Sequence, residues 1–139
     1  MISTIAVGTD GSATASEAVR MAADLARQLD AKLVLLSAFE DSGHEAQGDS
    51  VELQWASSNS ARVREILNRA EAALRQGGID CKTRVEKGDP ADVLVQLATE
   101  CGADLLVIGS KGMQRRVLGS VPNSVAHKAP CSVLVAKTT

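Results

Sequence analysis

Short apolar segments alternate with helical stripes along nearly the whole chain, and this alternation is the feature that most restricts the fold. Runs such as Leu105–Ile108 have no polar interruption, which is typical of parallel strands covered on both faces. Between these runs, apolar residues recur every three or four positions, as they do on one face of an amphipathic helix. The strands are expected at 3–9, 32–39, 81–85, 105–108 and 131–136, and the helices at 15–29, 63–74, 90–101 and 121–129. This order predicts an α/β fold with three layers, α/β/α, in which right-handed crossovers join a five-stranded parallel sheet.

Composition limits the classes of partner. The 139 residues are sufficient for a single domain, residues 1–139, with a buried core, and leave no room for a second. One Trp, one Phe and no Tyr disfavour a role in stacking nucleic-acid bases. A net charge of −2 offers no basic surface for nucleic acid or for an anionic membrane. The apolar runs are too short to span a bilayer and the N-terminus does not resemble a signal peptide, so we expect a cytoplasmic protein with neither nucleic acid nor membrane as partner.

The cysteines and the middle of the chain carry weaker signals. Cys81, Cys101 and Cys131 are widely spaced and form no CxxC pair, so reduced, mostly buried thiols are expected. The segment Glu40–Asn59 is polar and shows no sustained period, which predicts a long loop of the kind that often carries function. Trp55 in this segment would either pin the loop onto the body of the protein or contact a ligand or a second subunit.

A candidate phosphate-binding loop follows the fourth expected strand, in the segment from Ala103 to Ser120 (ADLLVIGSKGMQRRVLGS). Gly109, Gly112 and Gly119 carry no Cβ, so the backbone N–H groups around them can approach an anion closely. A helix is expected to start at Ser120, and a helix N-terminus adds unpaired N–H donors and the positive end of a dipole. A glycine-rich connection that holds no ligand would show the same pattern.

The expected topology strengthens the ligand interpretation. In doubly wound sheets, ligands bind beyond the carboxyl ends of the strands, where the strand order reverses. If the order is 3-2-1-4-5, this switch point lies between the first and fourth strands, which lead into Gly8–Ser12 and Gly109–Gly119. Asp10 could accept ribose hydroxyls or hold Mg²⁺ through water, while the glycine loop and Ser120 hold phosphate oxygens. Asp10 could also form an Asx turn that caps the first helix, and the two roles are compatible.

Three motifs, taken together with the strand rhythm, resemble a known family. VGTDGS at 7–12, G-x-x-G at 109–112 and GSV at 119–121, before a closing CSVLV, resemble the universal stress protein family over essentially the whole chain. The resemblance implies a flavodoxin-like fold of the adenine nucleotide alpha hydrolase-like kind, with ATP at the switch point and the main chain of Ala38 against adenine. The predicted nucleotide-binding residues are Gly8, Thr9, Asp10, Ala38, Ile108, Gly109, Gly112, Arg115, Arg116, Gly119, Ser120 and Val121, with Asp10 a possible Mg²⁺ ligand through water or phosphate.

One departure from the family pattern concerns the phosphate loop. The ATP-binding pattern is usually written G-2x-G-9x-G-[S/T], whereas only six residues separate Gly112 from Gly119 here. A loop three residues shorter could close over fewer phosphates or remodel the start of the final helix. It contains Arg115 and Arg116, which either concentrate positive charge where phosphates would lie or remain solvated on the loop surface.

The resemblance implies a stress-response protein that binds an adenine nucleotide, ATP first, as a regulatory ligand. No nucleophile stands next to a base and the GxxxxGK[ST] motif is absent, so we expect no enzyme of fast turnover and at most slow ATP hydrolysis. The alternatives are a variant that binds cyclic AMP or AMP, because the glycine loop is short, and a dimeric interaction module without nucleotide. An adenylate-forming or nucleotidyl-transferring enzyme would need a basic or histidine motif near the first loop, where TDGSATAS has none.

The last expected strand suggests a protein partner. Cys131–Ala136 is apolar on both faces and would be an outer strand of the sheet. An uncovered apolar edge promotes aggregation unless another chain pairs with it. We therefore expect a homodimer through this edge, which is also the assembly that the resemblance implies.

Overall fold

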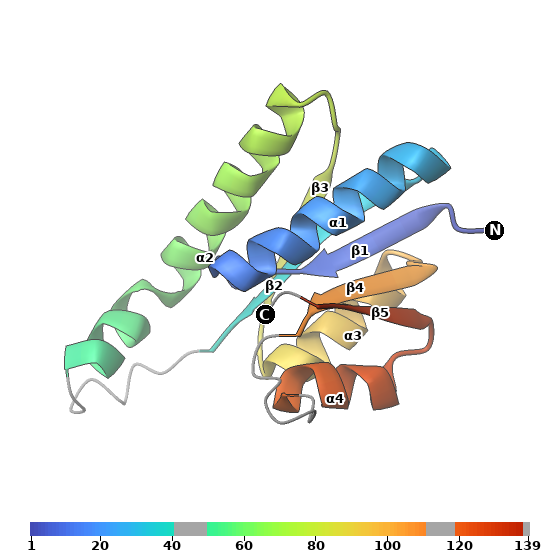
Figure 1. The fold of residues 1–139 in the computed structure, drawn as a ribbon. Coiled ribbons are helices and arrows are strands. Elements are labelled where there is room, and N and C mark those ends of the chain that lie inside the picture. The colour runs from blue at the N-terminus through green and yellow to red at the C-terminus, as the bar shows by residue number, and fades with distance from the viewer. Residues whose placement is uncertain (41–49, 111–118, 138–139) are drawn as a thin grey trace.

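In the described part of the chain, five strands form one parallel sheet in the order β3-β2-β1-β4-β5 (Figure 1). The computed structural model describes residues 1–40, 50–110 and 119–137, with only the backbone described for residues 50–59. The strands are β1 (Thr4–Gly8), β2 (Lys32–Phe39), β3 (Lys82–Lys87), β4 (Leu105–Gly109) and β5 (Ser132–Ala136). The expected fold class and strand order are confirmed.

Two helices cover each face of the sheet, which gives the expected three layers (Figure 1). The helices are α1 (Ala13–Leu29) and α2 (Ser50–Gln76) on one face, and α3 (Pro90–Glu100) and α4 (Ser120–Lys128) on the other. Successive side chains of a strand point to opposite faces. Ile5 and Val7 of β1 accordingly pack under α1 and α2, whereas Ala6 packs under α3 and α4. Both faces of β1 are therefore buried, as its apolar sequence requires.

Helix α1 packs on the sheet through small side chains. Its buried face consists of Val19 and five alanines, namely Ala15, Ala18, Ala22, Ala23 and Ala26. The helix starts at a side-chain cap, because the Ser12 hydroxyl accepts a hydrogen bond from the N–H of Ala15 at 3.1 Å. The connection from β1 to α1 is only four residues long, 9–12, and its last residue, Ser12, is this cap.

The expected loop Glu40–Asn59 is wrong over its second half, because α2 begins at Ser50. Residues 41–49 lie outside the described residues. The first turns of α2 extend past the sheet (Figure 1). Helix turns that cover no sheet need no apolar stripe, and the sequence therefore shows no helical spacing of apolar residues there. The stripe begins where Val63 and Leu67 reach the core. Trp55 accordingly belongs to a helix rather than to a loop, and its side chain lies outside the description.

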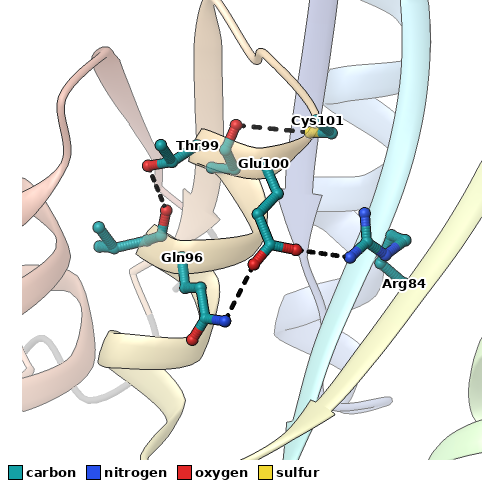
Figure 2. A network of polar contacts seen from close by, with 7 residues as sticks. Arg84, Gln96, Thr99, Glu100 and Cys101 are labelled. Atoms are coloured by element: carbon teal, nitrogen blue, oxygen red, sulfur yellow. Dashed lines mark hydrogen bonds and ion pairs between the residues drawn. The ribbon is translucent and has the colours of Figure 1, made fainter.

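The edge strand β3 agrees with its alternating sequence. It runs from Lys82 to Lys87, slightly later than expected, with exposed residues at both ends and half-buried ones between them. Figure 2 shows the Arg84 guanidinium donating to the Glu100 carboxylate at 2.7 Å, and the Gln96 side-chain amide donates to the same carboxylate at 3.0 Å. These hydrogen bonds from Gln96 and then Arg84 lower the pKa of Glu100. The network ties this edge of the sheet to the end of α3.

The three cysteines are free thiols in the structure. Cys81 is buried, whereas Cys101 and Cys131 are half-buried. Burial raises the pKa of the Cys81 and Cys131 thiols, which favours their protonated and unreactive form. Within residues 1–40, 50–110 and 119–137, no helix combines the length and the apolar character needed to cross a membrane.

Candidate functional site

The strand order reverses between β1 and β4, which are hydrogen-bonded neighbours at the centre of the sheet. Their register pairs Val7 with Val107, so the chain leaves both strands at the same edge, after Gly8 and after Gly109. The two glycine-bearing connections therefore start side by side. This is the place where doubly wound sheets bind their ligands.

Thr9 fixes the start of the β1–α1 turn. The residue is buried, and its N–H donates to the carbonyl oxygen of Leu36 at 2.9 Å. The Ser37 hydroxyl, itself buried, donates to the Thr9 carbonyl oxygen at 2.7 Å. The Thr9 hydroxyl in turn accepts from the N–H of Gly11 at 3.1 Å. The backbone of Thr9 thus joins the turn to the end of β2, and its side chain holds the turn itself through Gly11.

Asp10 lies at the tip of this turn. Its Oδ1 accepts a hydrogen bond from the N–H of Ser12 at 2.9 Å, which confirms the expected Asx turn, although the residue that caps α1 is Ser12 and not Asp10. The carboxylate is exposed to solvent and held by its own turn, so it places a negative charge at the carboxyl end of β1.

Gly8 has a structural explanation of its own. A Cβ at this position would lie 3.0 Å from Cδ1 and 3.1 Å from Cδ2 of Leu94, which is tighter than ordinary van der Waals contact. Leu94 belongs to the buried face of α3. The absence of a side chain at Gly8 therefore allows α3 to approach β1, and its predicted contact with a nucleotide stays a prediction.

Ala38 lies at the same edge of the sheet, near the end of β2. It is half-buried and pairs with Glu86 of β3, and the next residue, Phe39, accepts a hydrogen bond from the N–H of Gly88 at 2.8 Å. Since Ser37 contacts Thr9, the backbone of Ala38 follows directly on a residue bound to the β1–α1 turn. The structure thus brings two of the sequence-predicted segments, 8–10 and 38, together.

The end of β4 is fully enclosed. Ile108 and Gly109 are buried, and Ser110 is completely buried with its N–H donating to the carbonyl oxygen of Ala136 at 2.9 Å. Ile108 packs in the apolar cluster beneath α3 and α4. Its side chain is therefore part of the core, and its predicted contact with a nucleotide stays a prediction.

Helix α4 begins without a side-chain cap. Gly119 is the N-cap residue in extended conformation, and it has no side chain to accept a hydrogen bond. The first helical hydrogen bond runs from the N–H of Asn123 to the carbonyl oxygen of Gly119 at 3.0 Å. The first turn contributes the N–H groups of Ser120 and Val121, since Pro122 has none. Such a helix start, with its positive dipole end, is suited to an anion.

Three of the predicted residues, Gly112, Arg115 and Arg116, fall in the segment 111–118, outside the described residues. The consequence of the short loop therefore stays a prediction. Over the ranges that the structure does describe, there is no group of three or more His, Cys, Asp or Glu side chains that could hold a metal ion.

Two residues that support the turn were not predicted from the sequence. Ser37 had a usable signal, because it is a hydroxyl residue within the apolar run LVLLSAF and a buried hydroxyl needs a partner. Ile66 of α2, whose side chain lies against Gly11, had none, since its contact depends on where α2 lies on the sheet.

Comparisons with known proteins agree with this architecture. A universal stress protein of Mycobacterium tuberculosis strain H37Rv is 39% identical, over 98% of this chain and 97% of the relative. A crystal structure of a universal stress protein in complex with cAMP has a TM-score of 0.79 and 33% identity, covering 99% of both chains. The universal stress protein of Archaeoglobus fulgidus in complex with dAMP has a TM-score of 0.70 and 25% identity, covering 97% of this chain and 98% of the other.

The fold and the strand order, which reverses between β1 and β4, define a doubly wound α/β protein of the flavodoxin-like, nucleotide alpha hydrolase-like class. The chain belongs to the universal stress protein family, whose model matches residues 1–137.

Proposed function

We propose that this protein binds an adenine nucleotide at the switch point, as a regulatory ligand in a stress response rather than as a substrate of fast turnover. Two features after neighbouring strands carry the proposal. The turn after β1 holds the Asp10 carboxylate and is hydrogen-bonded to β2. The helix that follows β4 in the chain begins without a side-chain cap. The complexes of two relatives with cAMP and dAMP support an adenine nucleotide in particular.

Each described residue then has a defined role. The N–H groups of Gly119, Ser120 and Val121 bind phosphate oxygens, because they point out of the first turn of α4. The Asp10 carboxylate accepts ribose hydroxyls or holds Mg²⁺ through water or phosphate. The ion would need the nucleotide's own oxygens as further ligands, since Asp10 alone is too few donors for Mg²⁺. The main chain of Ala38 contacts the base, at the end of β2.

The identity of the nucleotide separates two forms of the proposal. ATP is the expectation from the family motif, and the cationic residues of the 111–118 loop would serve its terminal phosphates. Cyclic AMP or AMP is favoured by the short loop and by the relative bound to cAMP. A single phosphate needs fewer N–H donors than a triphosphate, and the first turn of α4 supplies them. Competition between the three ligands on one protein sample decides between these forms.

Equilibrium binding to the nucleotide-free protein is the first test. Isothermal titration calorimetry with ATP, AMP and cyclic AMP, each with and without Mg²⁺, is expected to show one site per chain for at least one of them. Absence of binding of all three at millimolar concentration would refute the proposal and favour the interaction module without nucleotide. Phosphate release from ATP, followed over hours, is expected to be slow or undetectable, and fast turnover would contradict the regulatory role.

A substitution at the start of α4 tests the phosphate site directly. Gly119 has φ −62° and ψ 168°, a conformation that any residue adopts, so Gly119→Asp places a capping carboxylate over the same N–H groups. We expect unchanged or slightly higher stability, by a few tenths of a kcal/mol as is usual for Gly against Asp at an N-cap, together with loss of nucleotide binding. Gly119→Ala is the matched control, since it adds a side chain without a charge. Equal binding by both variants would exclude this helix start as the phosphate site.

The role of Asp10 has a similarly matched test. Asp10→Asn keeps the Oδ1 acceptor for the Ser12 N–H and removes only the charge. Asp80→Asn is the control, because Asp80 is an exposed aspartate just before β3, at the amino ends of the parallel strands. We expect Asp10→Asn alone to weaken Mg²⁺-dependent binding.

We also propose a homodimer formed through β5, in a cytoplasmic protein. This edge strand leaves Val133, Leu134 and Val135 only half-buried. Val133→Lys or Val135→Lys is expected to lower the mass seen in light scattering, whereas Val85→Lys on the opposite edge strand leaves it unchanged. If the parent protein already has the mass of a monomer, the dimer proposal is wrong.

A further inference from the structure

The side chain of Ile66 lies directly against the backbone of Gly11. A Cβ on Gly11 would lie 2.7 Å from Cδ1, 3.0 Å from Cγ1 and 3.1 Å from Cγ2 of Ile66. Cβ atoms in real structures essentially never have a neighbour closer than 3.0 Å, so the isoleucine fills the space that a side chain at position 11 would occupy. The contact joins the middle of α2 to the tip of the β1–α1 turn.

Helix α2 holds Ile66 in place through its neighbours. Val63 and Leu67 are buried in the core between α1, α2 and the sheet. Ile66 lies between these two residues in sequence and is half-buried. Helical residues one position apart point in different directions, so Ile66 contacts the turn at the rim of that core. The rigid packing of Val63 and Leu67 therefore fixes where the Ile66 side chain lies.

Gly11 is the most constrained point of the turn. It has φ +83°, the left-handed region, and its N–H donates to the Thr9 hydroxyl. The hydrogen bond from Ser12 to Asp10 begins one residue later. Movement of Gly11 would therefore disturb its own hydrogen bond to the Thr9 hydroxyl and, through the adjacent Ser12, the hydrogen bond to the Asp10 carboxylate.

We propose that Ile66 is a positioning residue for the ligand-binding turn: its side chain, seated on Gly11, holds the Asp10 carboxylate in the place where a nucleotide meets it. The importance of the turn for a ligand rests on the proposed function, whereas the effect on the turn itself does not. Ser37 supports the turn from β2 by a hydrogen bond, and Ile66 supports it from α2 by contact. A change in the packing of α2 at Ile66 is consequently expected to change the affinity for a nucleotide bound at Asp10.

The test uses the full chain and three variants. Ile66→Ala removes all three contacting atoms, and Ile66→Val removes only Cδ1. Leu74→Ala is the matched control, since Leu74 is another half-buried aliphatic residue of α2 that packs on the core away from the turn. Nuclear magnetic resonance follows the exchange of the Gly11 and Ser12 amide hydrogens without ligand, and calorimetry measures the Kd of the tightest of ATP, AMP and cyclic AMP.

We expect faster exchange of the Gly11 and Ser12 amides in Ile66→Ala but not in Leu74→Ala, with Ile66→Val close to the parent. Releasing about one residue of the turn is expected to raise the Kd of Ile66→Ala roughly tenfold. Unchanged exchange in Ile66→Ala, or equal changes in both alanine variants, would overturn the proposal. If the parent binds none of the three nucleotides, the proposed function fails. The exchange rates of the Gly11 and Ser12 amides then decide by themselves whether Ile66 positions the turn.

Discussion

Replacing Gly11 by alanine tests the geometry of the turn most sharply, because two separate effects oppose the new Cβ. Gly11 has φ +83°, which costs an ordinary residue about 1–2 kcal/mol. The new Cβ would also lie 2.7 Å from Cδ1 of Ile66, so this side chain must leave its position at a cost of about 1–3 kcal/mol, as for overpacked sites. We expect Gly11→Ala to lower the free energy of unfolding by about 2–4 kcal/mol, after the smaller gain from restricting the unfolded chain.

Gly78 provides a control for the backbone cost. It follows α2 with the same φ of +83°, and a Cβ there would have no neighbour within 4 Å. Gly78→Ala therefore carries the conformational cost without the steric one, and we expect a loss of about 1 kcal/mol. The difference between the two variants, about 1–3 kcal/mol, measures the contact between Gly11 and Ile66.

The assay is urea unfolding followed by circular dichroism, with equal m-values required for the comparison. A double-mutant cycle with Ile66→Ala completes it, because removing the isoleucine makes room for the new methyl group. The double variant should be more stable than the sum of the single losses predicts, by about 1–2 kcal/mol. If the Gly11 and Gly78 variants lose equal stability, or if the two substitutions at positions 11 and 66 simply add, the close contact does not exist.

Two further predictions concern single hydrogen-bonded groups. Ser37→Ala leaves the buried carbonyl oxygen of Thr9 without its side-chain donor and should cost about 1–3 kcal/mol in urea unfolding; a loss below about 0.5 kcal/mol would contradict the buried hydrogen bond. Asp104 accepts hydrogen bonds from the backbone N–H groups of Ser3 and Thr4 and from the Ser3 hydroxyl, which lower its pKa in the folded state. Its stabilising effect is therefore present above about pH 4, the unfolded value, and is lost as the pH falls through the lower folded pKa. Thermal unfolding should show Asp104→Asn less stable than the parent at pH 7 and the difference shrinking in acid; a difference that does not change between pH 7 and pH 2 would exclude a role for the charge.

The position of the switch point was predictable from the sequence because it depends on topology. Glycine-bearing turns after the first and fourth strands become neighbours only if the strand order reverses between those strands, and the alternation of strands and helices favours such an order. The Asx turn at Asp10 and the helix start at Ser120 depend on residues close in sequence, so both could be recognised locally.

The roles of individual residues were harder to predict from the sequence. Gly8 was predicted as a ligand contact, which stays a prediction, and its packing role against Leu94 had no signal in the sequence. The start of α2 was missed because its first turns extend past the sheet and carry no apolar stripe. Ile66 gave no signal, since an isoleucine that contacts a turn and one that enters the core look alike in a helical pattern.

The sequence by itself determined the fold class, the order of the elements and the start of the last helix at Ser120. These properties follow from periodicity and from contacts between residues near one another in the chain, which one sequence records directly. Only the tertiary structure decided what supports the Asp10 turn, namely Ser37 from β2 and Ile66 from α2. Such contacts join residues far apart in the chain, and they exist only once the sheet and its helices have packed together.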